Sequence, residues 1–118
     1  MEMVSTALLL FVAGFETTTN LLGNGLHALL SHPDQFARLR ADPSLIPVAV
    51  EEPLRYDSPI QVDARTVLEP TVLAGTELEP GRLVVTLLGA ANHDPDRFTD
   101  PDRLDIARTD ATHLADAS

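Results

Sequence analysis

The sequence predicts a mainly α-helical fold with a small β component. Residues 2–31 contain no proline, and their apolar side chains recur at spacings of three and four, which is typical of a helix. All nine prolines lie at position 33 or later, and residues 60–90 contain short apolar runs separated by turn sequences, which favours strands. A length of 118 residues suffices for one domain.

The first expected element is a long helix over residues 2–31. Its apolar stripe is matched by further apolar residues on the opposite side, as in a helix enclosed by a larger protein. Its one sustained apolar run, Thr6–Phe15, is about half as long as a membrane span. The run follows Glu2 rather than a basic residue, and no cleavage site follows it. We therefore expect a cytoplasmic chain without membrane contact. Because this helix is apolar on most sides, we also expect the isolated chain to aggregate or to pack loosely.

Two shorter helices are expected over residues 33–56. Ser31-His32-Pro33 is typical of a helix start, and Asp42-Pro43-Ser44 is typical of a break. The next helix is expected to begin near Pro47 and to continue through Arg55. Pro53 lies inside it, where the missing donor and the crowded carbonyl of Ala49 cost about 3 kcal/mol. Pro53 therefore counts against regular helical geometry for a Glu52–Arg55 pair.

Short strands are expected over residues 60–90, and an irregular loop over residues 91–113. The strands are predicted at Val62–Leu68, Thr71–Leu73 and Leu83–Leu88, with turns at Ala74-Gly75-Thr76 and Pro80-Gly81. The loop is acidic and contains two similar strings, each with a turn at Asp-Pro.

Charge and cysteine content exclude several functional classes. The chain has 18 acidic residues against 8 basic residues, all of them arginine, and a net charge of −10. This charge repels nucleic acid, so no nucleic-acid partner is expected. Without cysteine, the chain forms no disulfide, no thiolate metal site and no cysteine nucleophile.

The first candidate site is Ala13-Gly14-Phe15-Glu16-Thr17-Thr18, inside the apolar helix. Thr17 can donate a hydrogen bond to the carbonyl of Ala13, which loosens the helix locally. Gly14 leaves space for a small ligand, and Glu16 could pass protons to it through Thr17 or water. The alternative is that Glu16 and the threonines form an ordinary solvated face.

The second candidate is Glu52-Pro53-Leu54-Arg55, whose charged residues share one helix face at spacing i, i+3. Alone, such a pair is usually a surface ion pair of small energy. However, three strings in this order give the chain a resemblance to the cytochrome P450 family. They are Ala-Gly-x-Glu-Thr-Thr, then Glu-x-x-Arg, then Pro101-Asp102-Arg103-Leu104. The resemblance is to its soluble bacterial branch and extends to Leu114.

The resemblance implies a partial cytochrome P450 domain over residues 1–115. Its parts would be the distal helix (2–31), two shorter helices (33–56), short strands (60–90) and the meander loop (91–113). Residues 116–118 would be a divergent tail, because the family continues from His113-Leu114-Ala115 into Phe-Gly-x-Gly and the haem-binding cysteine. The chain is therefore expected to be an internal fragment, from a truncated or frame-shifted gene.

The resemblance also implies roles for single residues. Glu16 and Thr17 would deliver protons to dioxygen at the haem, and Ala13 and Gly14 would line the oxygen groove. Arg65 would pair with one haem propionate and His113 with another.

A buried structural triad of Glu52, Arg55 and Arg103 is implied as well. Arg97 lies in a second copy of the meander string, but the order of the motifs favours Arg103. Removal of one member would leave the other charges buried without a partner.

The implied family activity is haem-dependent insertion of one oxygen atom from dioxygen into a small apolar molecule, with electrons from a ferredoxin-type donor. Because the axial cysteine is missing, the chain alone is expected to be inactive and not to bind haem stably.

The residues leave two alternatives open. The first is a weak haem-binding remnant that uses Arg65 and His113, with His113 or His93 in place of the thiolate. The second is a calcium loop formed by the aspartates at 94, 96, 100, 102 and 105. Phe98 at a ligand position and Thr99 at the place of the turn glycine disfavour it.

Overall fold

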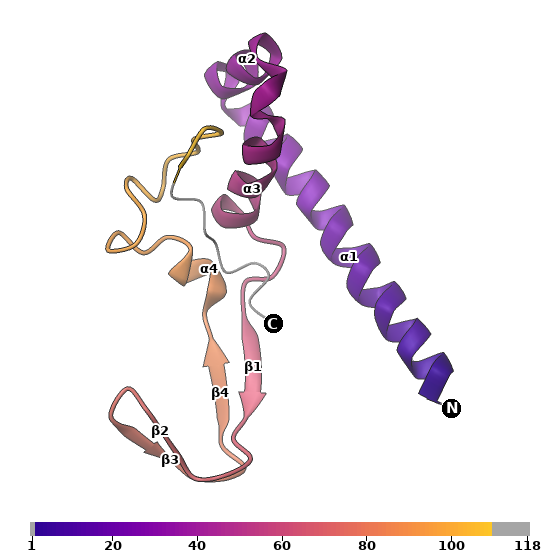
Figure 1. Cartoon of the computed structure of the whole chain (residues 1–118), viewed down its shortest axis with the longest axis vertical. Coiled ribbons are helices and arrows are strands. Elements are labelled where there is room, and N and C mark those ends of the chain that lie inside the picture. The colour runs from indigo at the N-terminus through magenta and orange to yellow at the C-terminus, as the bar shows by residue number, and fades with distance from the viewer. Residues whose placement is uncertain (1, 110–118) are drawn as a thin grey trace.

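The computed structural model describes residues 2–109, which fold into four α-helices, one short 3₁₀ helix and four strands. This confirms the expected fold class, mainly α with a small β component. Figure 1 shows α1 as a long rod whose C-terminal half lies beside α2 and α3, while the strands extend away from the helices. The elements in order are α1 (Glu2–Ser31), α2 (Pro33–Ala41), η1 (Pro43–Leu45), α3 (Ile46–Tyr56), β1 (Asp63–Thr66), β2 (Thr71–Leu73), β3 (Thr76–Leu78), β4 (Leu83–Thr86) and α4 (Leu88–Ala91).

Helix α1 crosses α3 at a glycine. A Cβ atom placed on Gly25 would lie 3.3 Å from Cβ of Pro53, so the glycine allows the two helices to come close. Pro53 is buried in this contact, and α3 continues through it to Tyr56. The Glu52–Arg55 pair forms on this helix despite Pro53, and burial of the proline ring against α1 offsets the cost of the missing backbone hydrogen bond.

By length and composition, α1 could cross a membrane from Met3 to Ser31. The ten-residue run considered in the sequence understates this property, because apolar residues continue after Asn20. A core helix of a soluble protein meets the same criterion.

The turn between α2 and α3 is held by Asp42. Its Oδ1 accepts hydrogen bonds from the hydroxyl (2.6 Å) and the backbone N–H (3.1 Å) of Ser44, at the start of η1. These bonds, with that from the hydroxyl contributing most, lower the pKa of the Asp42 carboxyl. The break expected at Asp42-Pro43-Ser44 is thus a capped 3₁₀ turn.

The strands form two separate antiparallel pairs. β1 pairs with β4, with Arg65 opposite Val84, and β2 pairs with β3. Strand β3 differs from the sequence prediction, which places Thr76 in the turn. The turn is only Ala74-Gly75, both with positive φ (48° and 79°). This two-residue turn allows Thr76 to pair directly with Leu73. The chain beyond Thr86 also differs from the prediction, because residues 88–91 form α4.

The molecule is extended. Its radius of gyration is 17.5 Å, whereas a compact domain of this length has about 13–14 Å. The buried apolar side chains lie on α1, α3, α4 and the loop after α4, and they are Ala28, Ala49, Leu88, Phe98, Leu104 and Ile106. The N-terminal half of α1 is exposed, with Leu9 and Phe11 at 66% and 67%. A large apolar surface therefore has no cover within residues 2–109.

Candidate functional site

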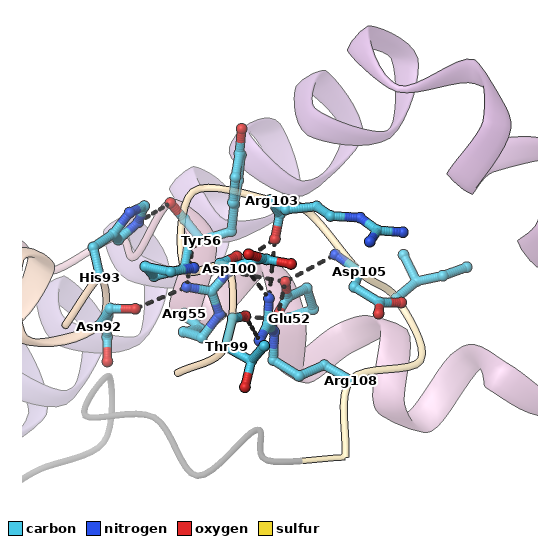
Figure 2. Close-up of polar contacts among 12 residues, drawn as sticks. Glu52, Arg55, Tyr56, Asn92, His93, Thr99, Asp100, Arg103, Asp105 and Arg108 are labelled. Carbon is cyan, nitrogen blue, oxygen red and sulfur yellow. Dashed lines mark hydrogen bonds and ion pairs between the residues drawn. The ribbon is translucent and has the colours of Figure 1, made fainter. Parts of the chain in front are cut away.

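A buried cluster of charges joins α3 to the loop after α4. Glu52 and Arg55 are both fully buried, and two parallel hydrogen bonds of 2.9 Å connect their side chains. The Glu52 carboxylate also accepts hydrogen bonds from Nε of Arg108 (3.1 and 3.2 Å) and from the backbone N–H of Asp105 (2.9 Å). One carboxylate thus holds two guanidinium groups (Figure 2).

Backbone carbonyls take up the remaining donors of both arginines. Arg55 donates to the carbonyls of Asn92 and Pro101 (both 2.8 Å) and of Arg103 (3.3 Å). Arg108 donates to the carbonyls of Thr99 (2.7 Å), Asp100 (3.3 Å) and Arg103 (3.1 Å). The path of the loop is therefore fixed by hydrogen bonds to buried guanidinium groups, because no helix or strand organises it.

The third member of the triad is Arg108, which corrects the prediction of Arg103. The side chain of Arg103 is exposed, and only its carbonyl oxygen belongs to the cluster. The signal that identifies Arg108 is alternating burial: Leu104, Ile106 and Arg108 are buried and the two residues between them are less so, although residues 105–108 form a turn rather than a strand. Arg103 has the opposite parity. Arg97, in the other copy of the string, is exposed, and its guanidinium lies over the Phe98 ring.

Helix α2 supports the same loop from the other side. Buried Gln35 accepts a hydrogen bond from the backbone N–H of Ile106 (3.3 Å), and Arg38 pairs with Asp105 (3.3 Å). The Arg38–Asp105 pair is half exposed and contributes little energy. The pair instead holds Asp105 in place, and the backbone N–H of Asp105 donates a hydrogen bond to Glu52.

The stretch Ala13–Thr18 lies in the exposed part of α1. The hydroxyl of Thr17 donates to the carbonyl of Ala13 at 2.6 Å, as the sequence predicted. A Cβ atom on Gly14 would meet no atom within 4 Å outside the local helix backbone, so there is open space beside it. The carboxylate of Glu16 is exposed. The described residues do not bring this stretch together with the Glu52 cluster.

Arg65 lies on β1, and the carboxylate of Asp63 binds its Nε at 3.0 Å. The side chain of Arg65 is 64% exposed. The bond to Nε leaves the two terminal nitrogens directed elsewhere, where a carboxylate could bind both. His113, the other expected propionate contact, lies outside the described residues.

The aspartates of residues 94–105 are engaged separately. Asp94 accepts a hydrogen bond from the N–H of Asp96 (2.9 Å), Asp102 binds His93 (3.0 Å) and Asp105 binds Arg38. Over residues 2–109, no three His, Asp or Glu side chains are grouped so that they could hold a metal ion. The calcium-loop alternative therefore has no support from the geometry.

Comparisons with known proteins find relatives of this chain. The family model described as cytochrome P450 matches residues 1–112. The chain is 49% identical over 114 residues to the biotin biosynthesis cytochrome P450 of Bacillus subtilis (strain 168), a match that covers 97% of this chain and 29% of that protein. It is 50% identical over 115 residues to the cytochrome P450 monooxygenase PikC of Streptomyces venezuelae, which covers 97% of this chain and 28% of that protein.

Solved structures give the same result. The chain matches CYP109E1 of Bacillus megaterium in complex with corticosterone with a TM-score of 0.91 and 41% identity, covering 97% of this chain and 31% of that one. It matches P450BioI in complex with an acyl carrier protein carrying hexadecenoic acid with a TM-score of 0.86 and 50% identity, covering 91% and 28%. The chain thus corresponds to less than a third of the length of these relatives.

Proposed function

Because the chain belongs to the cytochrome P450 family, we propose that it supplies the distal helix and the ion-pair core of a haem-dependent monooxygenase. The observation that carries this proposal is the combination of α1, with its Thr17–Ala13 bond, and the buried Glu52–Arg55–Arg108 cluster in one chain. Family membership also explains α1 as the core helix of a larger protein rather than a membrane span.

The residues present fit one side of a haem site. Arg65 can offer its terminal nitrogens to a propionate, His113 would contact the other propionate, and the open space beside Gly14 suits a small molecule. Haem, when bound, would supply the dioxygen chemistry. The sequence contains no cysteine, so the thiolate ligand must come from outside this chain. We therefore propose that the chain alone neither holds haem stably nor catalyses the reaction.

Proton delivery is assigned to Thr17 and Glu16. The hydroxyl proton of Thr17 is committed to the carbonyl of Ala13, so the lone pairs of Oγ1 can accept a hydrogen bond from a bound molecule or from water. The exposed carboxylate of Glu16 can take protons from solvent and return them through water. Ala13 has a small side chain and Gly14 has none, so they leave space on the helix surface next to Oγ1 of Thr17.

A chimera tests this assignment. The segment of PikC that matches this chain is replaced by residues 1–115, and the product is loaded with haem. We expect Thr17→Ala to lower the turnover number by about 100-fold, the usual contribution of proton transfer by a positioned group. Thr18→Ala, at the adjacent exposed position, is the matched control and should leave turnover nearly unchanged. Equal effects of the two substitutions would refute the role of Thr17.

For the parent enzyme we propose a small apolar substrate, a ferredoxin-type electron donor and a cytoplasmic location. These assignments rest on family membership. The acidic surface of the chain does not select a donor.

The second candidate function is weak haem binding through Arg65 and His113, and the exposure of Arg65 favours it. His93 is a poor iron ligand here, because Asp102 and the Tyr56 carbonyl occupy its two ring nitrogens. We expect haem titration of the isolated chain to give no saturable Soret shift. A saturable shift that disappears in both Arg65→Ala and His113→Ala would establish the second candidate instead.

A further inference from the structure

His93 faces hydrogen-bond acceptors with both ring nitrogens. Its Nδ1 lies 3.0 Å from Oδ1 of Asp102, and its Nε2 lies 3.0 Å from the carbonyl oxygen of Tyr56 at the end of α3. Figure 2 shows the ring directed at Tyr56, next to Asn92 and Arg55. The His93 side chain is 32% exposed, whereas that of Asp102 is 92% exposed.

The ring of His93 can therefore bridge two segments of the chain. One nitrogen faces a carboxylate of the loop and the other faces a carbonyl at the end of α3, and an N–H on either nitrogen can donate to the oxygen that it faces.

The two partners of His93 belong to the segments that surround Arg55. His93 follows Asn92, and Asp102 lies between Pro101 and Arg103; the carbonyls of Asn92, Pro101 and Arg103 all accept hydrogen bonds from the Arg55 guanidinium. The His93–Asp102 bond therefore joins two stretches of the loop on either side of one buried cation. The bond to the Tyr56 carbonyl attaches both stretches to α3.

We propose that His93 is a positioning residue: its ring holds the loop against α3, so that the carbonyl acceptors of Arg55 stay in place. We call His93, Asp102 and the Tyr56 carbonyl the histidine clasp. The clasp acts by joining the two stretches of the loop whose carbonyls bind Arg55.

Other charged groups near His93 do not replace Asp102. On α3, the ring centroid of Tyr56 is 6.0 Å from that of His93, and the Arg55 guanidinium is bound to the carbonyls. His32, before α2, contacts the Tyr56 ring edge-on with a centroid distance of 5.9 Å. Asp94 is bonded to the N–H of Asp96. Among the residues that the structure describes, the one carboxylate hydrogen-bonded to this ring is that of Asp102.

The clasp can be tested in the full chain through Tyr56. The sequence has one tyrosine and no tryptophan, so tyrosine fluorescence reports on the end of α3. Urea unfolding is followed for the wild type, His93→Gln, Asp102→Asn and the double variant. Each single substitution should reduce the folded-to-unfolded ratio about threefold. The double variant should reduce it only slightly further, because both substitutions remove the same hydrogen bond.

The control is His27→Gln, which removes an exposed histidine from α1 and should leave the Tyr56 transition unchanged. Asp102→Asn is a mild substitution at an exposed position, so it reads the clasp even if His93→Gln unfolds the chain. Additive effects of the His93 and Asp102 substitutions would overturn the proposal. A wild-type chain without a Tyr56 transition would overturn it as well, because the clasp would then not form.

Discussion

Arg108→Met should abolish the urea transition of Tyr56 or move it to much lower urea, whereas Arg103→Met should leave it in place. Arg108 is buried, binds Glu52 and donates to three carbonyls, so its loss leaves several buried acceptors without donors. Removal of one partner from a buried ion pair typically costs about 3–5 kcal/mol. That is a large part of the stability of any small domain, about 5–15 kcal/mol.

Arg103→Met is the matched control because it removes the same side chain five residues earlier. Arg103 is exposed and takes part only through its carbonyl, which methionine retains. We expect a change within about 0.5 kcal/mol, as for other surface substitutions. If Arg103→Met instead destabilised the chain more than Arg108→Met, Arg103 would be the third member of the triad.

The second large effect concerns the N-terminal half of α1. Its leucine, valine and phenylalanine side chains are mostly exposed, and each would gain about 1.5–3 kcal/mol from burial. At micromolar concentration we expect the isolated chain to associate through this surface and to bind the dye ANS, as exposed apolar patches do. The association should be visible in sedimentation velocity.

A triple variant, Leu8→Gln, Leu9→Gln and Phe11→Gln, should sediment as a monomer and keep the Tyr56 transition of the wild type. All three side chains are more than half exposed, so the substitutions remove no contact of the Glu52 cluster. Ile106→Gln is the control: this side chain is fully buried, and its replacement should abolish the transition. If the triple variant also lost the transition, α1 would be covered in solution by a surface that the structure does not show.

The elements differ in how far the sequence alone predicts them. The long helix was predictable because its pattern repeats over 30 residues. The tolerance of Pro53 was not, because it depends on Gly25, which lies 28 positions away in the sequence and meets Pro53 only across the α1–α3 crossing.

The loop after α4 shows the same limit. Motif order placed an arginine near the Glu52 pair but selected Arg103, since the loop has no regular period to indicate which side chains point inward. The alternation of Leu104, Ile106 and Arg108 was present in the sequence. It becomes informative only once Leu104 and Ile106 are known to be buried. The pairing of His93 with Asp102 is not predictable from the sequence, because neither residue type nor spacing indicates that the two side chains meet.

We infer that this chain is part of a cytochrome P450 fold in which the Glu52 cluster orders the described residues, while the N-terminal half of α1 is exposed. Amide hydrogen exchange of the full chain, resolved along the sequence, tests this claim most directly. We predict strong protection in α3 and in the N–H groups of Asp105 and Ile106, and weak protection in the first half of α1 and in the β2–β3 hairpin. Uniform protection from α1 to the hairpin, or no protection in α3, would contradict it.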